Sequence, residues 1–275
     1  ETLRIFFSTR NHDGITQAGF IDVDINQPEK IKNIAQEPVI KIGSNGLHDD
    51  CGAMPFSIVN ADNEYLFYYS GWHIPKTVSY DLSIGLCLSD DINSFRKRYK
   101  GPIFSKSKYD PYWAAAPCVI YENNIFKMWY ISCYDWVEID KKLEPVYNIK
   151  FAYSNDGHTW HRSFKATIKQ SYHGEALGRP WVIYEDEKYK MWYSMRGSKN
   201  YRSKEGEHYK IGYAESRDGI NWTRLDNLSG IETSKYGWDS EMIEYASVYK
   251  DKSRKFMFYN GNGFGKSGFG YASFE

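Results

Sequence analysis

The sequence lacks several features that would place it in other protein classes. Its 275 residues carry 35 Lys and Arg against 35 Asp and Glu, so the formal net charge is zero. A neutral chain offers no electrostatic case for binding nucleic acid or an anionic membrane surface. No apolar run approaches the roughly 18 residues that a membrane-spanning helix needs. We therefore expect neither a nucleic acid nor a membrane as partner.

Cysteine is scarce and has no metal-binding spacing. The four cysteines are Cys51, Cys87, Cys118 and Cys133, and no CxxC pair occurs among them. Their places in apolar segments predict free buried thiols rather than disulfides or a metal site. Free thiols favour a cytoplasmic location. The chain begins at Glu1 rather than Met, so the sequence is silent about any leading segment.

Helix-favouring runs of Ala, Leu and Glu are also scarce, while aromatic residues make up 17% of the chain. This balance favours β structure. The segment WVIYEDEKYKMWYS, residues 181–194, is typical of two apolar strands joined by a charged turn. Related hairpins occupy residues 57–70, 118–132 and 247–260, and residues 3–8 resemble the second half of another.

The second strands of these hairpins repeat with a period of roughly 61–66 residues, which predicts a radial or stacked architecture. They align at Phe7, Tyr69, Tyr130, Tyr193 and Tyr259. Third strands are predicted at residues 18–25, 83–91, 148–156, 209–218 and 268–274. Asp-Gly turns such as SNDGHTW, residues 154–160, then lead into a fourth strand.

We therefore predict an all-β fold, a five-bladed β-propeller of four-stranded antiparallel blades, forming one domain over residues 1–275. The N-terminal unit lacks an inner strand, and the C-terminal unit lacks an outer one. Trp129 and Trp192 occupy repeat positions and are expected to pack between blades.

Long connections are predicted at one end of the blades, at residues 72–82, 134–147 and 196–208, whereas the turns at the other end are tight. Long loops on a rigid scaffold are where binding and catalysis usually occur. The segments that enter the inner strands at this end all carry acids: Asp49, Asp50, Asp110, Glu175, Asp239 and Glu241. Acids that converge in a cleft shift one another's pKa values, as glycoside hydrolysis requires.

Other residue types at this end suit a carbohydrate. Arg179 is a candidate for pairing with a carboxylate or phosphate, and His73 for hydrogen bonding to substrate. Trp72 and Trp113 offer flat rings for sugar faces. Asn260, in the glycine-rich segment of residues 259–272, offers an amide. No metal ligand set and no cofactor are predicted, and a structural cation on the axis is left open.

The hairpins WAAAPCVIYENNIFKMWYIS and GRPWVIYEDEKYKMWYS, with the Ser-x-Asp-Gly-x-x-Trp turns, resemble the blade signature of five-bladed propeller glycosidases. This superfamily comprises glycoside hydrolase families 43, 32, 68, 117 and 130. The whole chain is similar to glycosidase-like propellers of bacterial sugar and polysaccharide gene clusters.

By position, the resemblance implies Asp50 (or Asp49) as base, Asp110 as a pKa-tuning residue and Glu175 as general acid. The Asn-Asp-Pro and Glu-Gly-Pro motifs of those families are absent, and Tyr109 stands where an Arg-Asp-Pro motif has Arg. Resemblance to family 130 implies phosphorolysis, with Arg179 and a histidine holding phosphate.

The leading hypothesis is a glycoside hydrolase or phosphorylase acting on a carbohydrate through acid and base carboxylates. Glu241 is an equally credible acid. The alternatives are a non-catalytic propeller that binds a glycan, a sugar nucleotide or a partner protein, and a non-hydrolytic sugar-modifying enzyme of polysaccharide biosynthesis. The sugar, the linkage, the stereochemistry and the oligomeric state are left open.

Overall fold

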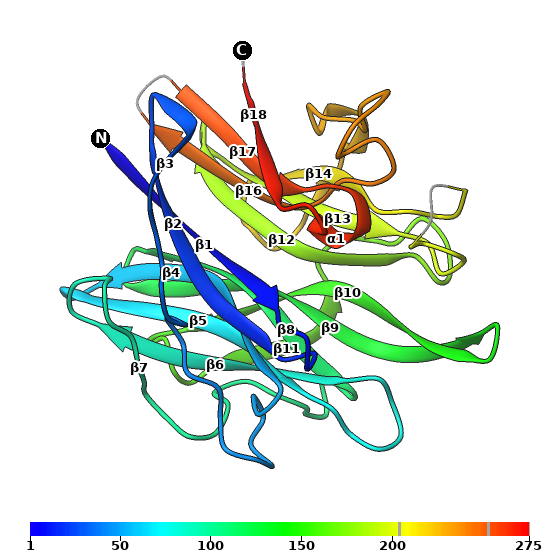
Figure 1. The fold of residues 1–275 in the computed structure, drawn as a ribbon. Coiled ribbons are helices and arrows are strands. Elements are labelled where there is room, and N and C mark those ends of the chain that lie inside the picture. Colours follow the sequence, from blue (N-terminus) through cyan, green and yellow to red (C-terminus); the bar gives the residue numbers. More distant parts are fainter. Residues whose placement is uncertain (203–204, 252–253, 275) are drawn as a thin grey trace. The chain divides into compact units, whose positions relative to one another are not determined.

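The structure, a computed structural model, describes residues 1–202, 205–251 and 254–274. Over these residues it consists almost entirely of strands, which follow one another as five antiparallel groups (Figure 1). By contact density, the chain forms two compact units, Glu1–Lys127 with Tyr153–His161 and Met128–Ala152 with Arg162–Glu275. The prediction of a single domain stays a prediction beside this division.

The first group contains β1 (Thr2–Arg10), β2 (Thr16–Asp24) and β3 (Gln27–Ile34). The second contains β4 (Gly52–Ala61), β5 (Glu64–His73), β6 (Asp81–Ser89) and β7 (Arg96–Lys97). A single parallel pair, Thr16 with Gly52, joins these two groups into one sheet. The third contains β8 (Trp113–Glu122), β9 (Ile125–Ile139), β10 (Lys142–Ser154) and β11 (His161–Ala166).

The fourth group contains β12 (Ala176–Glu185), β13 (Lys188–Arg196), β14 (Lys210–Ser216) and β15 (Thr223–Arg224). The fifth contains β16 (Glu244–Asp251), β17 (Arg254–Asn260) and β18 (Phe269–Ser273). Two short helical turns, η1 (Asp226–Leu228) and α1 (Asn262–Gly265), follow β15 and β17. The N-terminal group thus lacks a first strand and the C-terminal group a fourth, as the sequence predicts. The chain has a propeller fold, and the closure of five blades around one axis stays a prediction.

One predicted loop is a strand pair instead. Residues 134–147 were expected to form a long connection, but β9 and β10 continue through them to a two-residue turn at Asp140 and Lys141 (green in Figure 1). Both turn residues have positive φ, 51° and 65°, which matches the twist of a tight hairpin. The same turn type joins β4 to β5, β8 to β9 and β12 to β13. The turn of the hairpin at 247–260 includes residues 252–253, outside the described residues.

The Asp-Gly turns tie neighbouring repeats together. Gly157 and Gly219 have φ of +73° and +74°, and each exposes its carbonyl to an aromatic donor from the preceding group. The Tyr68 hydroxyl donates to Gly157 O (3.0 Å), and Trp129 Nε1 donates to Gly219 O (2.7 Å). The predicted packing role of Trp129 is therefore confirmed. Trp192, also buried, donates to Ser229 O at 3.1 Å.

A β-bulge recurs in the first strands. Ala116, Arg179 and Tyr245 have positive φ between 51° and 59°, an uncommon conformation for residues other than glycine. In two cases a serine from the preceding group accepts the N–H of the bulge residue. Ser70 Oγ accepts from Ala116 and Ser194 Oγ from Tyr245, both at 2.9 Å. We call these two serines the latch serines.

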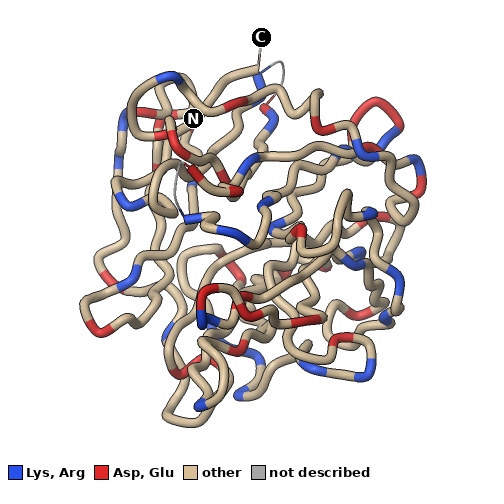
Figure 2. The backbone as a smooth tube through the Cα atoms, turned by 90° about the vertical axis from the view of Figure 1, so that its right-hand side faces the viewer, with Lys and Arg blue, Asp and Glu red and all other residues tan. Residues whose placement is uncertain are grey.

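The prediction of free cysteine thiols is confirmed. All four cysteines are free, and three of them are buried. No helix of the described residues is long and apolar enough to span a bilayer. Basic and acidic residues are both distributed over the backbone (Figure 2).

The Asp-Gly turns generate a stability prediction. Asp156 accepts N–H bonds from His158 and Thr159. Burial would raise the pKa of Asp156, but these bonds outweigh it and lower the pKa from 3.8 to about 2. Asp156→Ala should cost about 1 kcal/mol of unfolding free energy at neutral pH.

Because the folded pKa is depressed, this contribution is present above the unfolded pKa and is lost as pH falls from 3.8 to about 2. Denaturant unfolding at pH 7 and near pH 2.5 measures both effects. Asn155→Ala, at the exposed neighbouring position, is the control and should be nearly neutral. An Asp156→Ala penalty that stays constant across this range would contradict the account.

Candidate functional site

Two of the predicted acids anchor their own sheets. Asp49 is 0% exposed, accepts a hydrogen bond from the Tyr69 hydroxyl at 2.8 Å and forms an ion pair with Lys97. Asp239, also buried, accepts from the Tyr259 hydroxyl at 2.8 Å. Both tyrosines are repeat positions of the second strands. The burial of Asp49 and Asp239 argues against their predicted contact with substrate.

Asp110 is likewise inside the protein. Its backbone exchanges hydrogen bonds with Ser107 in a tight turn, and its carboxylate accepts from the Ser107 hydroxyl at 3.3 Å. The side chain is 0% exposed. This placement fits a residue that orders the segment before β8, and substrate contact is not supported.

Asp50, by contrast, keeps part of its carboxylate at the surface. Its side chain is 13% exposed, and it is held by His73 Nδ1 at 2.9 Å and by the Gly46 N–H at 2.8 Å. Burial alone would raise the pKa of Asp50. The hydrogen bonds from His73, Gly46 and Cys51 outweigh burial, so the pKa lies below its usual value. Asp50 is therefore ionised at neutral pH and oriented by its neighbours.

A pocket of about 150 Å³ lies beside this pair. Polar side chains line it together with a larger share of apolar surface, and its residues are His48, His73, Asp81, Leu82, Ser83, Pro102, Ser105 and Lys106. His48 Nδ1 lies 2.7 Å from the Ser83 hydroxyl, and burial lowers the pKa of His48. Lys106 pairs with Asp81 at 2.5 Å. The pocket thus presents imidazole, hydroxyl and ammonium groups within reach of one small polar ligand.

Aromatic rings continue from this pocket edge. Trp72 is half-buried, packs on Tyr80 at 4.5 Å and lies under the Arg10 guanidinium at 4.7 Å. Tyr80 in turn contacts Trp113 at 5.8 Å. Trp72 retains exposed surface for a sugar ring. Trp113 is buried in β8 and supports this aromatic cluster from inside the sheet, which argues against its predicted stacking on substrate.

In the second compact unit, Glu175 is held in a bidentate ion pair. Arg224 donates to both carboxylate oxygens, at 2.7 and 2.8 Å, and the Ser171 N–H donates at 2.6 Å. Burial would lower the pKa of Arg224, but its bond to Glu175 raises it above the usual value. Glu175 is buried with both oxygens engaged, so its predicted role as general acid is not supported.

The arginine that the sequence singled out does not make that ion pair. Arg179 is a bulge residue of β12, and its guanidinium lies 5.6 Å from the Trp181 ring. Its predicted contact with phosphate or a substrate carboxylate stays a prediction.

Glu241 is the predicted acid that the second unit leaves accessible. Its side chain is partly exposed and has no hydrogen-bond or ion-pair partner among residues 1–202, 205–251 and 254–274. Its N–H bonds to Asn262 Oδ1 at 2.7 Å, and Asn262 Nδ2 reaches Gly237 O at 3.0 Å. Asn260, on β17, donates to Phe264 O at 3.2 Å and so is partly used by the chain itself.

Glu244 was not predicted as a site residue. This first residue of β16 is 0% exposed, so its carboxyl is shielded from water. Burial raises the pKa of Glu244 well above its usual value, and the nearby Tyr245 and the Arg196 charge oppose this shift only in part. The sequence signal that could have identified Glu244 is an acidic residue among apolar residues at the beginning of a strand. The positions before the bulge in the other first strands are Pro55, Ala115 and Gly178.

Arg196, at the end of β13, belongs to the same buried region. It donates to Tyr209 Oη at 3.1 Å, to Gly197 O at 2.8 Å and to Pro145 O at 2.9 Å. It is buried, with no carboxylate within ion-pair distance among the described residues. Because Arg196 donates only to neutral acceptors, no ion pair neutralises its positive charge, and this charge can stabilise a negative charge nearby.

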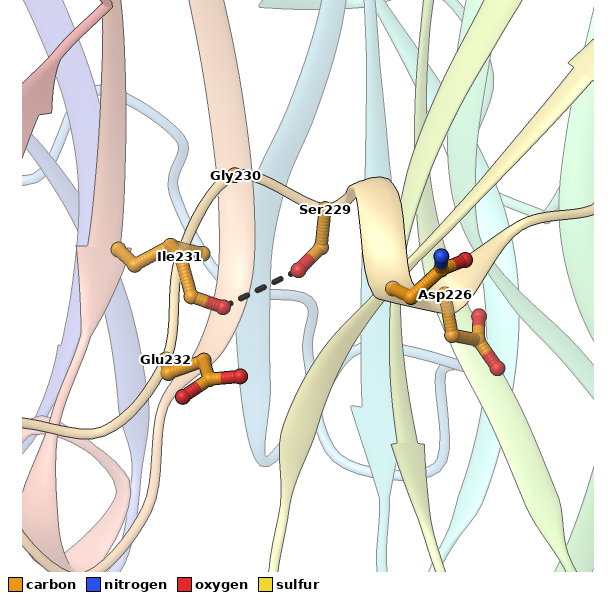
Figure 3. A pocket seen from close by; sticks show the side chains of 6 residues that line it. Asp226, Ser229, Gly230, Ile231 and Glu232 are labelled. Carbon is orange, nitrogen blue, oxygen red and sulfur yellow. Dashed lines mark hydrogen bonds between the residues drawn. The ribbon is translucent and has the colours of Figure 1, made fainter.

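Another pocket, of about 210 Å³, surrounds η1 and the turn after it (Figure 3). Asp226 and Glu232 lie at its two sides, and Ser229 Oγ donates to Ile231 O at 3.1 Å. Asp226 already accepts from Tyr193 Oη and Arg224 Nε, both at 2.5 Å. No group of three or more His, Cys, Asp or Glu within the described chain is placed to hold a metal ion.

The structure therefore brings Asp49, Asp50, Trp72 and His73 together in the first unit, and Asp239 and Glu241 together in the second. Their convergence in one axial funnel stays a prediction. The chemically distinct groups are an oriented Asp50 with a lowered pKa, a Glu241 whose carboxylate is unpaired among the described residues, and a Glu244 whose pKa is raised by burial.

Comparisons with known proteins place this geometry in context. No family model matches the chain. Among solved structures, one described as a complex of BT0996 and RGII has a TM-score of 0.78 at 17% identity, and the match covers 100% of this chain and 84% of the solved one. A thermostable family-43 glycoside hydrolase has a TM-score of 0.66 at 16% identity, covering 94% and 84%.

A third structure is described as "The GH130 family of mannoside phosphorylases contains glycoside hydrolases that target beta-1,2 mannosidic linkages in Candida mannan". Its TM-score is 0.69 at 15% identity, and the match covers 100% of this chain and 81% of the solved one. The likeness to these structures establishes the fold, that of glycoside hydrolase propellers.

In sequence, the uncharacterized protein Rv1502 of Mycobacterium tuberculosis is 34% identical over 276 aligned positions, which cover 100% of this chain and 89% of the relative. At this identity and coverage, the chain belongs to the same family as Rv1502.

Proposed function

We propose that this protein cleaves a glycoside, with Asp50 as the ionised carboxylate of the reaction. The observation that supports this most is the Asp50–His73 pair, whose histidine lines a pocket, beside the half-exposed Trp72. A general base must be deprotonated at working pH and fixed in direction. The hydrogen bonds from His73 and Gly46 supply both conditions.

The shared fold supports the same class of reaction. The solved neighbours are glycoside hydrolases, and the description of one names mannoside phosphorylases. In this proposal Asp50 takes a proton from attacking water, and Trp72 stacks on a sugar face.

Phosphorolysis is a second candidate, which the pocket lining favours. His48, His73 and Lys106 line the pocket of about 150 Å³ with the hydroxyl groups of Ser83 and Ser105, and a bound phosphate would compete with Asp81 for Lys106. Inorganic phosphate would then replace water as the group that bonds to the anomeric carbon. Comparing turnover with and without phosphate separates the two reactions.

The first test uses a panel of 4-nitrophenyl glycosides, β-1,2-mannobiose and oligosaccharides from RGII, each with and without phosphate. We expect turnover of at least one, and Asp50→Asn should reduce kcat/KM by about 10²–10⁴-fold because the base is lost. Asp62→Asn, which removes a charge from an exposed turn, is the matched control and should keep full activity. Binding without turnover would favour the non-catalytic alternative, and full activity of Asp50→Asn would rule out the assigned base.

The second test concerns pH. His73 lowers the pKa of Asp50 from the ordinary 3.8, so His73→Ala should raise it. The acidic limb of the kcat/KM profile should then move to higher pH, with the variant losing a larger share of its activity near pH 4. His12→Ala, at an exposed position, should leave the limb in place. If the acidic limb of the kcat/KM profile does not move in His73→Ala, His73 does not influence the group whose titration limits activity.

The third test separates structure from catalysis at Glu175. Glu175→Gln keeps the shape but removes the charge that pairs with Arg224. Unfolding free energy should fall by about 2–3 kcal/mol, less than for an isolated buried pair because Asp226 also neutralises Arg224. The folded variant should keep kcat within a few-fold. A loss of kcat without a loss of stability would restore Glu175 as the acid.

A further inference from the structure

Trp238 differs from the tryptophans whose indole groups are engaged by the fold. Four of those donate the indole N–H to a backbone carbonyl at 2.7–3.1 Å: Trp129, Trp181, Trp192 and Trp222. The indole N–H of Trp238 has no hydrogen-bond partner among the described residues, and the residue is 37% exposed. Both its N–H and part of its ring are therefore left for another molecule.

The ring of Trp238 is seated on two glycines of the last group of strands. A Cβ at Gly261 or at Gly270 would overlap carbon atoms of the six-membered ring. A positive φ accounts for neither glycine, whereas the close approach of Trp238 accounts for both. These glycines lie at the end of β17 and in β18, the red part of Figure 1. The backbone there is shaped to receive this ring.

The repeat itself does not need a ring at this place. In three other groups, the glycine of the third strand faces the ring of the second-strand residue paired with it: Gly19 with Phe7, Gly85 with Tyr69 and Gly212 with Tyr193. In the fifth group, Gly270 is paired with Tyr259, but Trp238 occupies the space over the glycine. The rings of Trp238 and Tyr259 lie 5.0 Å apart with their planes inclined by 30°. Trp238 is thus an additional ring on top of the repeat.

The turn that carries Trp238 is held in place by Asn262. The Asn262 N–H donates to Trp238 O at 2.7 Å, and its side-chain Nδ2 donates to Gly237 O at 3.0 Å. Its Oδ1 accepts the N–H of Glu241 at 2.7 Å. An aromatic ring that is fixed in advance loses little conformational freedom when it binds a ligand. The turn therefore presents Trp238 in a form ready for stacking.

The surroundings of the ring are polar. Apart from Tyr236 and Trp238, residues 233–241 and 260–263 are all polar residues or glycine. The side chain of Glu241 is partly exposed and has no partner within the described chain. A stable protein interface buries about 800 Å² per partner around an apolar centre, which such a surface does not provide. A pyranose has C–H groups on its face and hydroxyls at its edge, so it matches an aromatic ring among polar groups.

We propose that Trp238 is a binding platform for a pyranose ring of a glycan, with Glu241 accepting hydrogen bonds from the sugar hydroxyls. Every residue of this site belongs to the second compact unit. Binding there makes and breaks no covalent bond, and it uses neither Asp50 nor Trp72. The site therefore goes beyond the proposed cleavage and does not depend on it.

Fluorine NMR of protein labelled with 5-fluorotryptophan tests this site directly. The chain has nine tryptophans, and the signal of Trp238 is the one that is missing from Trp238→Phe. The probes are cellotriose, xylotriose, β-1,4-mannotriose and β-1,4-galactotriose. We expect the Trp238 signal to shift and saturate with at least one probe. The Kd should be the same in Asp50→Asn, because this binding does not involve the proposed base.

A Trp238 signal that none of the four probes moves would overturn the proposal. If the Trp72 signal moves and the Trp238 signal does not, the platform is wrong while the proposed function keeps its support. If the Trp238 signal moves in a protein that cleaves no glycoside, the platform stands and the proposed function fails.

Two variants test the parts of the platform. Gly270→Ala displaces the ring and should weaken binding about 10-fold. Glu241→Gln should weaken it about 3–10-fold, because a hydrogen bond to a charged group is lost. Tyr271→Ala is the matched control and should leave the Kd unchanged. Tyr271 is 38% exposed and follows Gly270, but alternation along β18 places its side chain on the opposite face of the strand.

Equal weakening by Glu241→Gln and Tyr271→Ala would contradict the role assigned to Glu241. The molecular mass in solution tests the other occupant, a second copy of this chain. Trp238→Ala should leave this mass unchanged. A change from dimer to monomer would identify the ring as a contact between two copies and overturn the proposal.

Discussion

The bond between a buried tyrosine hydroxyl and a buried aspartate carboxylate is the constraint on which the candidate site depends. Tyr69 bonds to Asp49 and Tyr259 to Asp239, each linking a second strand to the segment that enters the first strand of the same group. Once the aspartate is fixed, the chain direction of the next residues is fixed as well. Asp50 and Glu241 follow one and two positions later, and both remain partly exposed. The buried aspartate thus determines the direction in which the chain presents the partly exposed acid that follows it.

Much of the fold could be predicted because it depends on local patterns. Alternating apolar residues located the second and third strands, and Trp129 was recognised as packing because it recurs in the repeat. The loop at residues 134–147 was mispredicted because the charged residues around the turn at Asp140 and Lys141, together with Pro145, interrupt the apolar pattern of a strand. The roles of the acids were harder to predict, since Asp49 and Asp50 are the same residue type and differ only in their surroundings. Arg224 was missed as the partner of Glu175 because it lies 49 residues away in sequence.

Environment also explains why carboxyl groups in one chain behave differently. Asp50 accepts hydrogen bonds that favour its ionised form, whereas the carboxyl of Glu244 is shielded from water, and the Tyr245 side chain and the Arg196 charge offset this only in part. Both oxygens of Glu175 accept hydrogen bonds from one guanidinium, so its charge stabilises the fold. Burial disfavours the ionised forms of Asp50 and Glu244, and the number and charge of the hydrogen-bond donors decide the direction in which each pKa moves. Residue type alone carries little of this information.

The latch serines have a consequence for how the chain folds and evolves. Ser70 and Ser194 each tie one group of strands to the next group along the chain. Contacts of this kind make stability a sum of local terms and nearest-neighbour terms, so folding can begin in one group and spread stepwise to the adjacent one. At these two junctions, an exchanged repeat would keep the hydrogen bond only if the serine and the following bulge were exchanged together. The segment that would have to be exchanged as a whole is then the junction between two repeats rather than a single repeat.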